Sequence, residues 1–190
     1  ALSLAKTISE QKVVLPHRTM LMVTITEEVG HGASHGLPPD VAELVSVDNA
    51  VCAPGQHSIE HGVTIPMADL HGPFDYHLTR KLCRLAKEQA IPHSRDVFRY
   101  YRSDAAAAIE AGAGTRAALV GFGLDGSHGW ERTHLDSLSA TYLLLRAWLQ
   151  TPLGAWDATP TGEMRDLPST ELPAPSEQGE PLTRGDFSEP

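Results

Sequence analysis

Long apolar runs, cysteines and basic clusters are scarce in this 190-residue sequence, and each scarcity excludes a class of protein. No apolar run approaches the ~20 residues that a membrane-spanning helix needs, so we expect no membrane partner. The two cysteines, Cys52 and Cys83, do not make a disulfide framework. Because no signal peptide is visible either, the sequence favours a reducing compartment, and we expect a cytoplasmic location.

Basic residues are also few, and the acidic ones are unevenly distributed. The net charge is −9, and residues 154–190 hold eight Asp or Glu against two Arg, a net of −6. Neither part of the chain offers a basic stripe, so we expect no nucleic-acid partner. From residue 151 onward the sequence is rich in Pro, Ser and Thr and has no periodicity. We therefore predict a folded part over residues 1–150 and an acidic, disordered tail over 151–190.

Strand and helix patterns intermix along the folded part. Short apolar runs predict strands over residues 20–26, 43–51, 62–69, 94–101 and 116–123. Apolar residues at helical spacing predict a helix over residues 76–90, and residues 135–150 are also predicted to be a helix. Ser103 as a cap and Gly112 as the closing glycine predict a helix over residues 103–112. Pro66 suggests an edge or a bulge in the third strand. Such intermixing is typical of an α/β layer architecture.

The opening segment "ALSLAKTISEQ" also has helical spacing, but no capping residue precedes it. A chain that begins inside a helix looks cut from something longer. A frayed terminal helix is the alternative.

Acidic and histidine side chains gather where predicted strands end: Glu27, Glu28, Asp48, His128 and His134. In open α/β sheets, ligands bind beyond the carboxyl ends of the strands. Carboxylate and imidazole ligands together suit zinc, cobalt or manganese. The sequence therefore predicts a divalent-metal site at this edge of the sheet.

The adjacent acids Glu27 and Glu28 could take two different chemical roles. Successive side chains of a strand point in opposite directions, so one carboxylate can bind metal while the next takes a proton from a metal-bound water. The alternative is that the pair merely begins a solvated loop.

Two other histidine-rich stretches compete as metal motifs. Residues 57–61, "HSIEH", match the H-x-x-E-H pattern of inverted zinc proteases, which requires a helix. The preceding Pro-Gly pair and the following Gly62 leave room for barely one turn, so we expect no zinc site of that kind. In "HGASHG", His31 and His35 could coordinate metal, but the glycines first indicate a tight, flexible loop beside the site.

Four motifs taken together resemble the M42 metallopeptidases, the glutamyl-aminopeptidase and tetrahedral-aminopeptidase family. They are "TITEEVGHGA", "VSVDNA", "YYRSDAAAAIEAGAG" and "GWERTH", and they occur in the family's order and spacing. The resemblance covers about residues 1–150 and implies a zinc-peptidase-like mixed sheet flanked by helices. It also implies that the chain is the C-terminal part of a catalytic domain and is incomplete at its N-terminus.

The resemblance also assigns roles to individual residues. Glu27 would be the general base, Glu28 and His134 would bind one metal, and Asp48 would bind the other. Asp104 matches a family Asp near the site and would hold either a ligand or the amino end of the substrate. The implied cofactors are two divalent ions, zinc first, with cobalt or manganese as alternatives.

The departures from the family pattern concern the missing ligands. The family's first metal-binding His, the Asp that bridges the metals and the inserted β domain all precede a segment like the one that opens this chain. After His134, "HLDSL" replaces the family's Ser-Pro and Glu, although Asp136 is nearby. Each metal would then have at most two ligands from this chain, fewer than the three usual for catalytic zinc. We expect the chain alone to bind metal weakly and to hydrolyse little.

The function implied by the resemblance is a metallo-aminopeptidase that removes N-terminal residues from peptides and forms a homo-oligomer. A deacylase or amidase on the same fold is one alternative. A non-catalytic module that keeps the fold for assembly is another.

Overall fold

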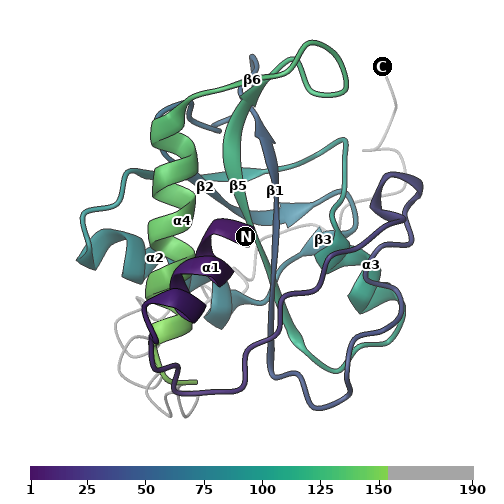
Figure 1. Ribbon diagram of the computed structural model, residues 1–190. Helices are drawn as coiled ribbons and strands as arrows, with labels where there is room; N and C mark the ends of the chain where they lie inside the picture. The colour runs from purple at the N-terminus through teal and green to yellow at the C-terminus, as the bar shows by residue number, and fades with distance from the viewer. Residues whose placement is uncertain (154–190) are drawn as a thin grey trace, which may run out of the picture. The chain divides into compact units, whose positions relative to one another are not determined.

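The computed structural model describes residues 1–153, so nearly all of the predicted tail lies outside the described residues (Figure 1). The elements in chain order are α1 (Leu2–Glu10), a short 3-10 helix η1 (Glu27–Val29), β1 (Glu43–Val51), β2 (Val63–Asp69), β3 (Gly72–Pro73), α2 (Tyr76–Glu88), β4 (His93–Val97), α3 (Asp104–Glu110), β5 (Arg116–Asp125), β6 (Arg132–Thr133) and α4 (Leu135–Gln150). Four of the five predicted strands and all predicted helices are present, with boundaries that differ by a few residues at most.

The six strands form one mixed sheet. Strand β5 pairs in parallel with the whole length of β1 and antiparallel with the start of β2. Strand β2 pairs in parallel with β4, and the short strands β3 and β6 pair antiparallel with β2 and β5. The register of β2 against β4 shifts between Pro66 and Ala68, which confirms the irregularity expected at Pro66.

The two faces of β5 are buried in two different apolar clusters. Ala118 and Val120 pack with residues of α1, α2, α4 and β2, whereas Ala117 and Leu119 pack with residues of α3 and β1. Because alternate side chains of a strand point to opposite faces, both faces of the sheet are covered. Figure 1 shows α2 and α4 on one side of the sheet and α3 on the other. The α/β architecture and the mixed sheet flanked by helices are confirmed.

The strand predicted over residues 20–26 is wrong. This segment pairs with no strand among residues 1–153, and Val23 and Ile25 are 73% and 94% exposed. An apolar run becomes a strand only where another strand accepts its backbone hydrogen bonds. Here the chain runs unpaired into η1, so Glu27 and Glu28 lie in a 3-10 turn and not at the end of a strand.

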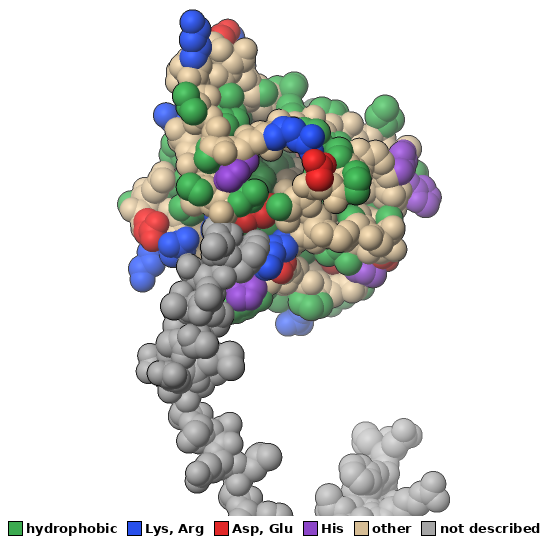
Figure 2. Space-filling view, turned by 90° about the horizontal axis from the view of Figure 1, so that it is seen from below, with side chains coloured by type: hydrophobic (Ala, Val, Ile, Leu, Met, Phe, Trp, Pro, Cys, Tyr) green, Lys and Arg blue, Asp and Glu red, His purple; other side chains and the backbone are tan. Residues whose placement is uncertain are grey.

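The surface agrees with the composition. None of the helices within residues 1–153 combines the length and apolar character needed to cross a bilayer. On the face shown in Figure 2, Lys and Arg side chains are scattered and often lie beside Asp or Glu. No basic stripe is visible among the described residues on this face, and the expected absence of a nucleic-acid partner stays a prediction.

Candidate functional site

Asp104, the first residue of α3, holds the loop that carries the adjacent acids. Its two carboxylate oxygens accept hydrogen bonds from the Thr24 hydroxyl at 2.5 Å and from the Ala33 backbone N–H at 3.0 Å. Gly32 permits this approach, because a Cβ atom there would lie 1.9 Å from an Asp104 carboxylate oxygen. The loop between Thr24 and Ala33 is thus fixed against the start of α3.

Asp48 lies within β1, opposite Gly121 of β5. One of its oxygens accepts the backbone N–H of Asn49 at 2.7 Å. Burial raises the pKa of Asp48, and the negative charges of Asp104 and Glu28 raise it further. Asp48 therefore lies where burial and nearby negative charges disfavour its ionised form.

Glu27 shares this environment. Its pKa is raised first by burial and then by Asp48, Asp104 and Glu28, in that order. His128 opposes these effects, and its Nε2 lies 3.6 Å from an Oε atom of Glu28. Four carboxylates and one imidazole therefore converge, and we call Glu27, Glu28, Asp48, Asp104 and His128 the acidic cluster.

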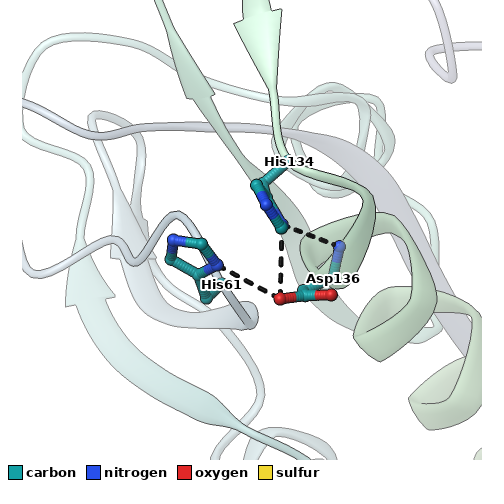
Figure 3. A group of neighbouring side chains, drawn as sticks. All are labelled: His61, His134 and Asp136. Atoms are coloured by element: carbon teal, nitrogen blue, oxygen red, sulfur yellow. Dashed lines mark hydrogen bonds and ion pairs between the residues drawn. The ribbon is translucent and has the colours of Figure 1, made fainter.

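His134 makes its side-chain contacts in a second group, which we call the histidine cluster: His61, His134 and Asp136 (Figure 3). The Nδ1 atoms of His61 and His134 lie 3.2 Å and 3.3 Å from the same Asp136 oxygen, Oδ2. The two imidazole rings are 4.1 Å apart between centroids. Of the five predicted site residues, four lie in the acidic cluster, and the contacts of His134 are with His61 and Asp136.

A buried carboxylate fixes the loop that carries His61. One oxygen of Asp96 accepts hydrogen bonds from the Gln56 side chain at 3.1 Å, the His57 backbone N–H at 2.9 Å and the Ser58 hydroxyl at 2.8 Å. Asp96 is only 3% exposed. These bonds explain why residues 57–61 form a compact loop and no helix, as expected from the neighbouring glycines.

A buried hydroxyl then joins this loop to α4. Ser137 donates a hydrogen bond to the Gly62 carbonyl at 2.6 Å and accepts one from the Gly123 N–H at 2.5 Å. Gly123 also permits close packing, since a Cβ atom there would lie 2.2 Å from the carbonyl oxygen of Ile59. The backbone next to His61 and the backbone next to Asp136 are therefore fixed to the same strand.

Sequence reasoning missed His61. The stretch "HSIEH" suggests a metal site only as a helical motif, and the partner His134 lies far along the chain. Within residues 1–153, neither the His31 nor the His35 side chain forms an ion pair or hydrogen bond with a carboxylate. The His31 carbonyl accepts the Ser34 hydroxyl at 2.7 Å, and Nδ1 of His35 lies 3.2 Å from that hydroxyl oxygen.

Comparison with known proteins identifies relatives of this chain. The sequence model of the M42 glutamyl aminopeptidase family matches residues 1–144. A putative aminopeptidase of Bacillus subtilis, YhfE, is 37% identical over 152 residues. The match covers 80% of this chain and 44% of YhfE, so the chain spans less than half the length of that relative.

Solved structures show the same fold. The TET aminopeptidase of a marine sediment thaumarchaeote superposes with a TM-score of 0.64 at 18% identity, over 78% of this chain and 45% of that one. The TET1 peptidase of Pyrococcus horikoshii superposes with a TM-score of 0.58 at 22% identity, over 68% of this chain and 40% of that one. With the fold shared and the family's sequence model matched over residues 1–144, this chain belongs to the M42 glutamyl aminopeptidase family.

Proposed function

We propose that this chain contributes to the catalytic domain of a metal-dependent aminopeptidase that hydrolyses the N-terminal residue from peptides. The observation that carries the proposal is the convergence of Glu27, Glu28, Asp48 and Asp104 in one cluster. Family membership and the similarity to YhfE, a putative aminopeptidase, support the reaction class.

The acidic cluster has the chemistry of a divalent-metal site. The charged groups that act most strongly on the pKa of Glu27 are Asp48, Asp104, Glu28 and His128, and no lysine or arginine is among them. Carboxylates gathered beside an imidazole, without a lysine or arginine among these groups, are suited to hold cations. Glu28 and His134 would hold one ion and Asp48 a second, with zinc first and cobalt or manganese as alternatives.

A bound divalent metal would supply Lewis acidity, which polarises a carbonyl group and lowers the pKa of water towards ~7. Glu27 would take the proton from the attacking water and deliver it to the leaving amine. Burial and the neighbouring carboxylates, which raise the pKa of Glu27, make it a better base than an exposed glutamate. Both oxygens of Asp104 already accept hydrogen bonds, which favours a positioning role in which Asp104 holds the loop that carries Glu27.

The proposal is tested by two substitutions in the complete protein. We expect Glu27→Gln to lower kcat on aminoacyl-anilide substrates by ~100- to 10,000-fold, because general-base catalysis is lost. Its metal content should stay near that of the wild type, whereas Glu28→Gln should lose metal. Normal turnover in the Glu27→Gln protein would contradict the assignment of Glu27 as the general base. Metal loss equal to that of Glu28→Gln would instead make Glu27 the metal ligand and Glu28 the general base.

A substrate panel separates the remaining functions. Hydrolysis of acylated amino acids in place of peptides would indicate a deacylase or amidase on the same fold. Structural integrity with no hydrolysis of either class would indicate an assembly module.

We also propose a homo-oligomer in a reducing compartment. The Pyrococcus horikoshii TET1 peptidase can assemble into a tetrahedron or a large octahedral shell, which supports self-association. Both cysteines of the chain are free thiols, which supports the reducing compartment and the expected cytoplasmic location. Light scattering coupled to size-exclusion chromatography would measure the assembly.

A further inference from the structure

The histidine cluster contains two electron-pair acceptors that face each other. Nδ1 of His134 accepts the backbone N–H of Asp136 at 3.1 Å, so this nitrogen presents a lone pair. The same nitrogen lies 3.3 Å from the carboxylate oxygen Oδ2 of Asp136. An imidazole nitrogen has one in-plane lone pair, so a metal cation bound at Nδ1 would replace the Asp136 N–H as its partner. The carboxylate oxygen beside it would attract the same cation.

The spacing of the ligand atoms fits a tetrahedral metal ion. Zinc bonds of ~2.0–2.1 Å to nitrogen and oxygen place neighbouring ligand atoms of a tetrahedron ~3.3–3.4 Å apart. Oδ2 of Asp136 lies 3.2 Å from Nδ1 of His61 and 3.3 Å from Nδ1 of His134. The three residues offer ligand atoms that all lie within 4.8 Å of one another. Two edges of a tetrahedron are thus already present.

We propose that His61, His134 and Asp136 form a mononuclear site for a borderline divalent cation such as zinc or cobalt. Two imidazoles and a carboxylate are the ligand types that such ions prefer, and three protein ligands leave one position for water. The site is different from the acidic cluster, because His61 and Asp136 are not members of it. The proposal uses only this chain's own residues and does not depend on the aminopeptidase assignment.

The backbone around the site is fixed in advance of binding. Ser137, which is fully buried, bonds to the carbonyl of Gly62 directly after His61 and lies directly after Asp136. Asp96 holds the preceding part of the loop. The ligand side chains themselves are open to solvent: 63% of His61, 43% of His134 and 63% of Asp136 is exposed. An ion can therefore enter without any opening of the fold.

One consequence does rest on the proposed function. His134 is shared between this site and the proposed pair of catalytic metals. An ion held with His61 and Asp136 would withdraw His134 from the pair, so excess zinc would inhibit turnover. His61→Ala should relieve that inhibition.

The test is a titration of the purified, tag-free 190-residue chain with Co²⁺, followed by its visible absorption and by calorimetry. We expect one Co²⁺ per chain with the intense spectrum of tetrahedral coordination, and no such binding of Mg²⁺. His61→Ala and Asp136→Asn should each weaken Co²⁺ binding by at least ~10- to 100-fold, the loss typical of removing only an outer hydrogen-bond partner of a ligand. His57→Ala is the matched control, because it removes an exposed histidine from the same loop.

Three results would overturn the proposal. The first is unchanged Co²⁺ affinity in His61→Ala, and the second is absence of binding to the wild type, which would leave the Asp136 N–H as the partner of His134 Nδ1. The third is binding that is lost in Glu28→Gln but kept in His61→Ala, which would place the ion in the acidic cluster. Because this last pair of variants separates the two clusters, failure of the new site and failure of the proposed aminopeptidase site are distinguishable.

Discussion

Ser137 gives the sharpest test of how the histidine cluster is held together. The pairing of β2 with β5 ends at Val63 and Phe122, so Gly123 has no strand partner on that side. The Ser137 hydroxyl accepts the Gly123 N–H and donates to the Gly62 carbonyl, and its side chain is fully buried. Ser137→Ala removes one oxygen atom and leaves both backbone groups without this partner.

The expected cost follows from those two groups. A buried polar group left without a hydrogen bond costs ~1–3 kcal/mol, so the substitution should lower the free energy of unfolding by ~2–6 kcal/mol. That is a large fraction of the ~5–15 kcal/mol by which a typical domain is stable. In a chain of this size it corresponds to a fall in Tm on the order of 10 °C.

Urea unfolding followed by circular dichroism measures this change. Ser139→Ala is the control, since Ser139 is an exposed serine two positions along the same helix, and its substitution should change stability by less than ~0.5 kcal/mol. Equal stability of the two variants would refute the reasoning. It would mean that water or a small backbone movement satisfies Gly123 and Gly62 without the hydroxyl.

Three further substitutions test the surrounding structure. Gly123→Ala should destabilise the fold by at least ~2 kcal/mol, because its Cβ atom would lie 2.2 Å from the Ile59 carbonyl, whereas Gly114→Ala, with nothing within 4 Å, should be tolerated; thermal melts compare the two. Asp96→Ala should cost ~2–4 kcal/mol in urea unfolding, because three donors lose one buried carboxylate oxygen, and a loss below ~0.5 kcal/mol would argue against its anchoring role. Asp48→Asn should stabilise the metal-free chain at pH 7, because burial and like charges raise the folded-state pKa of Asp48 above its unfolded value and so oppose its ionisation. This gain should shrink as the pH falls through the folded-state pKa towards the unfolded value of ~3.9, and a gain that grows on acidification would contradict the sign.

Local sequence patterns were sufficient to predict the boundaries of the elements with the clearest apolar periodicity. The helix over residues 135–150 and the strand over residues 43–51 were predicted with their observed boundaries. Both have long, clear patterns, and both lie against β5. Ser103 was predicted as a cap and does precede α3, but its side chain makes no capping bond, because it is engaged with Asp69.

The segment over residues 20–26 shows where such patterns fail. Its composition is that of a buried strand, yet the residues described here provide no strand to pair with it. A strand is a property of two segments, and the sequence of one segment does not reveal whether a partner lies beside it. Glu27 and Glu28 nevertheless come close to Asp48, because Asp104 fixes their loop through tertiary hydrogen bonds that no local pattern encodes.

The candidate site, like the fold, was predictable only in part. Residue chemistry and the resemblance to a known family were enough to select Glu27, Glu28, Asp48 and Asp104, which the structure brings together. The partnership of His134 with His61 was not predictable, because it depends on how a loop packs against the far end of β5. The assigned catalytic and metal-binding roles stay predictions.

The bond between Ser137 and Gly123 has a consequence for how the protein opens. A backbone amide at the end of a paired strand usually exchanges its hydrogen with solvent when that strand alone frays. Here the Gly123 amide is protected by a side chain of α4, so its deuterium exchange requires α4 to lift from the sheet. The amides of the first turns of α4 and that of Gly123 should then exchange with the same opening free energy, as one cooperative unit. The edge of the sheet that carries the histidine cluster would thus be as stable as the helix that covers it.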